Sequence, residues 1–125
     1  MAERYPPELQ QQAARLQQLQ QQLAQILTEK SVVQTELREI NRALDVLKDL
    51  PDNAIIYKSA GHLLIKIPKS NAEKELNDKK ELLELRLKSL EKQESIIRNQ
   101  INEVQSRINE IMARSYGKRS ETRAS

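Results

Sequence analysis

The feature that most constrains this chain is a seven-residue repeat of aliphatic side chains that runs through two long segments, residues 8–50 and 71–116. Such a repeat is typical of helices that pack side by side as a coiled coil. Ten of the twelve repeat positions in the first segment are aliphatic. The twelve positions are Leu9, Gln12, Leu16, Leu19, Leu23, Ile26, Lys30, Val33, Leu37, Ile40, Leu44 and Leu47. The positions of the second segment are Leu76, Lys80, Leu83, Leu87, Leu90, Glu94, Ile97, Ile101, Val104, Ile108 and Ile111.

Residues 54–67, between these segments, are the only stretch with the pattern of β-strands, because β-branched and aromatic residues are bounded there by turn formers. Gly61 adopts a positive φ at little cost, which predicts a hairpin with a loop of three or four residues within Ser59–His62. Ala60 disfavours a two-residue type I′ turn, which needs positive φ at both central positions. The predicted fold is mostly α: a long antiparallel two-helix coiled coil with a single β-hairpin at its base and both termini at its tip.

The hairpin is too apolar to stand alone, since a two-stranded hairpin is only marginally stable in water and both of its edges leave backbone groups unpaired. We therefore expect it to pair with the hairpins of other chains. The alternative is a hairpin that folds back on its own helices. Off-seam apolar residues near the base, Val46, Leu50, Leu82 and Leu85, fit packing against such neighbours. The candidate oligomerisation residues are Ile55, Ile56, Tyr57, Gly61, Leu63, Leu64, Ile65 and Ile67.

The helix ends are predicted from proline, glycine and capping residues. Pro6 and Pro7 suit a first helical turn, and Pro51 ends the first helix. Ser70 and Glu73 match a capping box at the start of the second helix. Gly117 is expected to stop that helix, which leaves residues 117–125 as a flexible tail of a single domain covering residues 1–125.

The tip is a candidate binding surface for apolar ligands, because helix ends fray and Gln12 weakens the seam there. The alternative is that the same residues simply continue the seam. The interruptions at Lys30 and Glu94 either set the register or, as we favour, reach solvent. The candidate tip residues are Leu9, Ala13, Leu16, Leu19, Val104, Ile108, Ile111 and Met112.

Composition argues against most other classes of protein. With no Cys, no Phe, no Trp, 31% charged residues and a net charge of +3, the chain suits exposed helices in a reducing cytoplasm rather than a large globular core. Lys and Arg alternate with Glu along both helical segments, so a nucleic-acid-binding face is not expected. There is no nucleophile–base pair, His62 has no second histidine or cysteine to bind a metal with, and no run spans a membrane. We expect no enzyme activity, no cofactor and no membrane partner.

The chain resembles the β-type subunit of archaeal prefoldin over nearly its whole length. The resemblance lies in the Pro6-Pro7 start, the Gln- and Leu-rich first helix, Leu50-Pro51-Asp52, residues 57–65 with Tyr57-Lys58 and Gly61-His62, and residues 83–94 of the second helix. A single hairpin points to the β type, since α-type subunits carry two.

This resemblance implies a hexamer of two α-type and four β-type subunits, with the hairpins forming a β-barrel platform and six coiled-coil arms below it. The distal ends of the arms would hold non-native client proteins and pass them to a group II chaperonin without ATP. A basic tail with Arg114, Lys118, Arg119 and Arg123 is a candidate for steering chaperonin docking. The alternative function is a structural coiled-coil oligomerisation module without chaperone activity.

Overall fold

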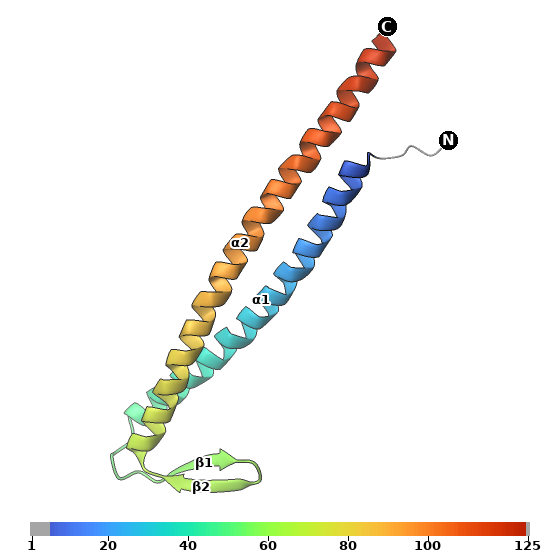
Figure 1. Cartoon of the computed structure of the whole chain (residues 1–125). Coiled ribbons are helices and arrows are strands. Elements are labelled where there is room, and N and C mark those ends of the chain that lie inside the picture. The colour runs from blue at the N-terminus through green and yellow to red at the C-terminus, as the bar shows by residue number, and fades with distance from the viewer. Residues whose placement is uncertain (1–5, 125) are drawn as a thin grey trace. The chain divides into compact units, whose positions relative to one another are not determined.

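The structure, a computed structural model, describes the backbone of residues 6–124 and the side chains of residues 6–115. Its elements are helix α1 (Pro7–Lys48), strands β1 (Ile56–Ala60) and β2 (Leu63–Ile67), and helix α2 (Lys69–Ala124), as labelled in Figure 1. Backbone contacts divide the chain into two compact units. We call residues 29–91 the hairpin unit, and residues 1–28 with 92–125 the terminal unit. The predicted combination of two long helices and one hairpin is confirmed.

In the hairpin unit, α1 and α2 run antiparallel and bury the predicted seam between them. The guanidinium of Arg86 donates a hydrogen bond to Glu29 over 2.6 Å, while Lys69, at the start of α2, reaches the carbonyl of Leu50, just beyond the end of α1. Seam residues between these two points are buried or half-buried, so the predicted seam positions face the partner helix. The buried residues of the whole hairpin unit are Val33, Ile40, Leu47, Ala72 and Leu90.

In the terminal unit the same repeat continues on both helices. Leu19 on α1 has no exposed surface, and Ile108 and Ile111 on α2 are buried. Leu9 on α1 and Val104 on α2 are half-buried. The seam interruption at Glu94 forms an ion pair with Arg98 of its own helix, with 2.8 Å between Oε2 and Nε.

The hairpin has a fixed antiparallel register that runs from Ile56 opposite Ile67 to Ala60 opposite Leu63. Gly61 and His62 therefore form a two-residue loop, so the predicted loop of three or four residues is wrong. The positive φ at Gly61 is confirmed, at 60°. Gly61 is the first residue of the loop, and no described residue other than glycine has positive φ, so the turn has the φ pattern of type II′. Ala60 therefore needs no positive φ and lies in β1.

The two helix boundaries next to the hairpin differ from the predicted ones. Helix α1 ends at Lys48, and the amides of Asp49 and Leu50 continue with bonds three residues back, to Val46 and Leu47, which tighten the last turn. Helix α2 begins at Lys69, because the carbonyl of Pro68 accepts hydrogen bonds from the amides of residues 71 and 72. The predicted capping box is therefore two residues too late, since Ser70 already lies inside the helix.

The predicted end of the second helix at Tyr116 is also wrong, because α2 continues through Gly117 to Ala124. A glycine inside a helix costs only about 1 kcal/mol relative to alanine, and it ends the helix only where it adopts the left-handed conformation. The side chains of the predicted tail, among them Lys118, Arg119 and Arg123, and the residue Ser125 lie outside the described residues, as do residues 1–5.

Substitution of Gly61 by alanine tests the turn. A Cβ at this position would meet no atom within 4 Å, so the change adds backbone strain and no clash. We expect the free energy of unfolding of the hairpin to fall by about 1–2 kcal/mol, measured by amide hydrogen exchange of β1 and β2. His62→Ala, in the same loop at a position without positive φ, is the control. Equal effects of the two changes would contradict this explanation of the turn.

Leu90→Ala tests the seam of the hairpin unit. Leu90 is fully buried, so removing three carbons should lower the free energy of unfolding by about 2–5 kcal/mol, measured by urea denaturation at fixed protein concentration. Ile96→Ala on the same helix removes a similar volume from an exposed side chain and should cost less than about 1 kcal/mol. A similar loss for both variants would show that the seam does not stabilise this helix pair.

Candidate functional site

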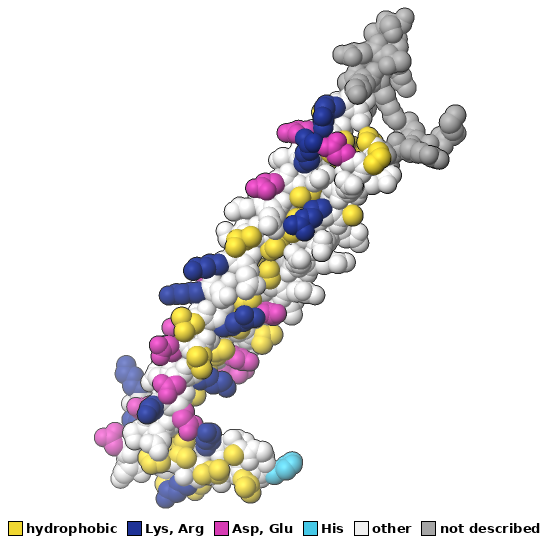
Figure 2. Space-filling view, viewed as in Figure 1, with side chains coloured by type: hydrophobic (Ala, Val, Ile, Leu, Met, Phe, Trp, Pro, Cys, Tyr) yellow, Lys and Arg dark blue, Asp and Glu magenta, His cyan; other side chains and the backbone are white. Residues whose placement is uncertain are grey.

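The hairpin exposes apolar side chains on both of its faces. Residues opposite each other in an antiparallel pair point to the same face. One face carries the pairs of Ile56 with Ile67 and Ala60 with Leu63, and the other carries the pair of Ser59 with Leu64, whose side chain is 72% exposed. Figure 2 shows yellow apolar side chains gathered over the hairpin beside its cyan histidine. A two-stranded sheet with two apolar faces and two free edges is a surface suited to pairing with other strands.

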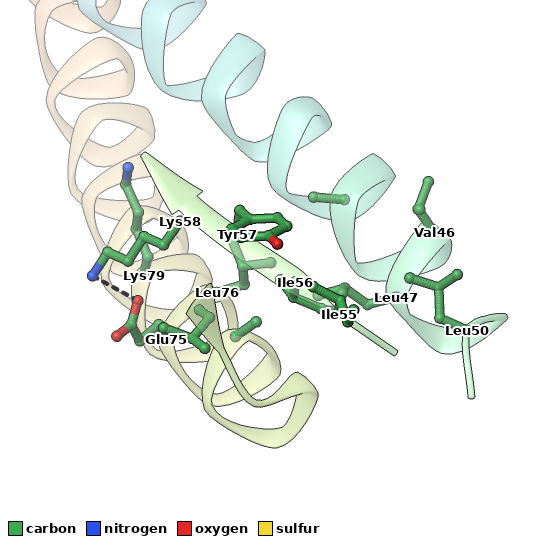
Figure 3. Close-up of a pocket in the computed structure, with 13 residues that line it drawn as sticks. Val46, Leu47, Leu50, Ile55, Ile56, Tyr57, Lys58, Glu75, Leu76 and Lys79 are labelled. Atoms are coloured by element: carbon green, nitrogen blue, oxygen red, sulfur yellow. Dashed lines mark ion pairs between the residues drawn. The ribbon is translucent and has the colours of Figure 1, made fainter. Parts of the chain in front are cut away.

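A pocket of about 730 Å³ lies between the hairpin and the two helix ends of the hairpin unit. Figure 3 shows its lining. Leu47 comes from α1, Ile56 from β1 and Leu76 from α2, while Leu50 and Ile55 come from the segment between α1 and β1. Its walls are mostly apolar. The hairpin therefore lies partly over its own helices, as the alternative expectation had it, and still leaves apolar surface uncovered.

Two lysines link the segments around the hairpin: Lys58 joins β1 to α2, and Lys69 joins the start of α2 to the segment that follows α1. Lys58 of β1 forms an ion pair with Glu75 of α2, with 2.9 Å between Nζ and Oε2 (Figure 3). Lys69 donates a hydrogen bond of 2.7 Å to the carbonyl of Leu50, and its Nζ lies 3.6 Å from Glu73. The Lys69 side chain is only 11% exposed, so this contact is the better shielded of the two.

Lys69 is a structural residue that the sequence analysis missed. Its Nζ contacts the carbonyl of Leu50 and the carboxylates of Glu73 in α2 and Asp52 in the segment after α1, the last at 3.7 Å. A cation in the first turn of a helix is unfavourable to the helix dipole. That unfavourable position was the signal that this lysine has partners elsewhere in the fold.

The predicted tip residues all lie in the terminal unit, but they differ in exposure. Met112 is 53% exposed and Ala13 is exposed, whereas Leu19, Ile108 and Ile111 are buried between the helices. Leu9, Leu16 and Val104 are half-buried. Only Met112 and Ala13 are freely available to a ligand in this conformation, and the other six need the helices to separate locally.

The off-seam residues near the hairpin also have two different environments. Val46 and Leu50 line the pocket, while Leu82 and Leu85 are exposed on α2. Among the residues that the structure describes, no group of three or more His, Asp or Glu side chains could hold a metal ion. No helix in the described part of the chain is both long and apolar enough to cross a membrane.

Comparisons with known proteins agree with this architecture. Residues 10–115 match the prefoldin subunit family. The chain is 49% identical over 119 residues to the prefoldin subunit beta of Sulfolobus acidocaldarius, with 95% of both chains covered. It is 53% identical over 116 residues to that of Saccharolobus islandicus, with 93% of this chain and 92% of the relative covered.

A solved structure matches as well. The crystal structure of the prefoldin beta subunit from Thermococcus strain KS-1 is 38% identical, with a TM-score of 0.82 over 87% of this chain and 96% of that chain. The beta2 subunit from the same strain, at 24% identity and a TM-score of 0.67, shares the fold. The chain belongs to the prefoldin family and is of the β type, so it is a subunit of a molecular chaperone that assembles with other prefoldin subunits.

Leu64→Ser tests whether the hairpin faces mediate this assembly. Burial of a leucine side chain contributes about 1.5–3 kcal/mol, and the loss recurs in every copy of the subunit. We expect a lower mass for the assembly in light scattering coupled to size-exclusion chromatography, at concentrations where the wild type stays intact. Lys66→Ser changes the residue two positions further along β2, which lies on the same face, and should leave the mass unchanged. An unchanged mass for Leu64→Ser would remove this face from the interface.

Proposed function

We propose that this chain is the β-type subunit of a hexamer of two α-type and four β-type subunits that captures non-native proteins and delivers them to a group II chaperonin in the cytoplasm. Capture needs neither ATP nor a catalytic step. Family membership over residues 10–115 is the observation that carries this proposal. The hairpin supplies the assembly surface, and the terminal unit supplies the client-binding surface.

The described side chains support this division of roles. Apolar groups on the hairpin are held in one register by strand pairing, which suits a fixed interface. Apolar groups in the terminal unit include the exposed Met112, whose flexible thioether adapts to irregular partners. A small surface of this kind binds weakly, but several arms around one unfolded chain raise the effective concentration and therefore the avidity.

The client-binding role predicts a local effect of Met112. A chemically unfolded protein is diluted into buffer without ATP, and its aggregation is followed by light scattering in the presence of the assembled hexamer. We expect Met112→Ser to weaken the suppression of aggregation by about twofold to tenfold per bound arm, since one apolar contact contributes on the order of 1 kcal/mol.

Ile96→Ser is the matched control, because Ile96 lies on the same helix in the terminal unit and is 56% exposed, close to the 53% of Met112. Equal effects of the two substitutions would mean that binding is not localised to the proposed residues. No suppression by an intact wild-type hexamer, across several clients, would favour a purely structural coiled-coil module.

A further inference from the structure

The terminal unit contains an ion-pair cluster centred on Glu8 that joins its two helices. One carboxylate oxygen of Glu8, Oε1, accepts a hydrogen bond from Nη2 of Arg107. Its other oxygen, Oε2, lies 3.9 Å from Nη2 of Arg114. Arg107 also contacts Glu110 of its own helix, with 3.3 Å between Nη1 and Oε2. Both oxygens of one carboxylate are thus directed to two arginines on the other helix.

The heptad repeat places this cluster on one edge of the seam. Glu8 directly precedes the seam residue Leu9, and Arg107 and Arg114 each follow a seam residue by three positions. The other edge of the seam at this end carries the exposed and uncharged Ala13 and Met112. One edge of the terminal seam is therefore held by charges and the other is apolar.

The cluster acts where the apolar seam is weakest. Helix α1 begins at Pro7, so Glu8 lies in its first turn, where a carboxylate is favoured by the helix dipole. The next seam position after Leu9 is the polar Gln12, and the first fully buried residue is Leu19. Between the helix start and Leu19, apolar burial alone holds this turn poorly, because helix ends fray.

We propose that Glu8, Arg107 and Arg114 form an ion-pair clasp that holds the first turn of α1 on α2, and that release of the clasp exposes Leu9, Ile108 and Ile111 to apolar segments of a non-native client. This inference rests on the proposed function, because it assigns the client surface an open and a closed form. A client first contacts the exposed Met112 edge, and the clasp on the opposite edge controls how many buried seam residues then become exposed to it.

The clasp is weak enough to be reversible. The side chains of Glu8 and Arg107 are 43% and 46% exposed, and exposed pairs contribute little and are screened by salt. Its removal should raise the open population by about twofold to fivefold without unfolding the arm. High salt should act on the wild type in the same direction.

The test is amide hydrogen exchange of residues 9–19 and 104–111 in the assembled complex, at about 0.02 M and about 0.5 M salt, which span strong and weak electrostatic interaction. We expect Glu8→Gln to raise these exchange rates by about twofold to fivefold at low salt and to remove most of their salt dependence. The double variant R107Q/R114Q should do the same, which separates the clasp from the effect of Glu8 on the dipole of α1.

Glu110→Gln is the matched control, because it removes the carboxylate that pairs with Arg107 within α2 and leaves Glu8 in place. It should behave as the wild type. The clasp is refuted if Glu8→Gln and R107Q/R114Q leave exchange unchanged, or if Glu110→Gln accelerates it equally.

Client binding is measured on the same variants by suppression of aggregation. Faster exchange together with stronger suppression supports the full proposal. Faster exchange without stronger suppression overturns the role of the clasp in client access. A wild-type assembly that suppresses nothing would instead overturn the proposed function, and the exchange data would still decide whether the clasp exists.

Discussion

The narrow apolar seam between α1 and α2 is the interaction on which the rest of this structure depends. In each unit one residue, Leu19 or Leu90, is fully buried, and the other buried residues in the described part of the chain are aliphatic. A two-helix seam covers only one stripe of each helix, so it cannot also cover a β-hairpin or off-seam apolar residues. The chain consequently forms stable helices while leaving apolar surface for other molecules.

Because the seam between the helices is narrow, the chain covers its own hairpin only in part. Its partners within the chain are the two helix ends, which half-bury Ile56 and Ile67 and leave Leu63 and Leu64 exposed. An ion pair between Lys58 and Glu75 also joins β1 to α2. A positioned hairpin with uncovered faces binds with little loss of conformational freedom, because strand register and orientation are set before the partner arrives.

Sequence predicted the features that local geometry determines. The seven-residue spacing fixed which faces of α1 and α2 are buried, and glycine chemistry predicted the positive φ at Gly61. The loop length was missed because both Ala60 and Ser59 fit a loop or a strand, and only pairing with Leu63 and Leu64 decides between them. The Glu8 cluster was missed because an ion pair between residues 99 positions apart depends on the register of two helices.

The two candidate surfaces differ in how their apolar groups are held, and this difference suits their roles. Hairpin side chains are kept exposed by backbone pairing, so this surface is present without any opening step, and in the proposed function its fixed register selects matching partners. Terminal seam residues such as Ile108 and Ile111 are buried by contacts between helices, so they can be uncovered only at the cost of those contacts. In the proposed function, that cost keeps the surface closed to folded proteins, which offer no long apolar segment in exchange, and lets non-native chains open it. Selectivity for the non-native state then needs no recognition of sequence.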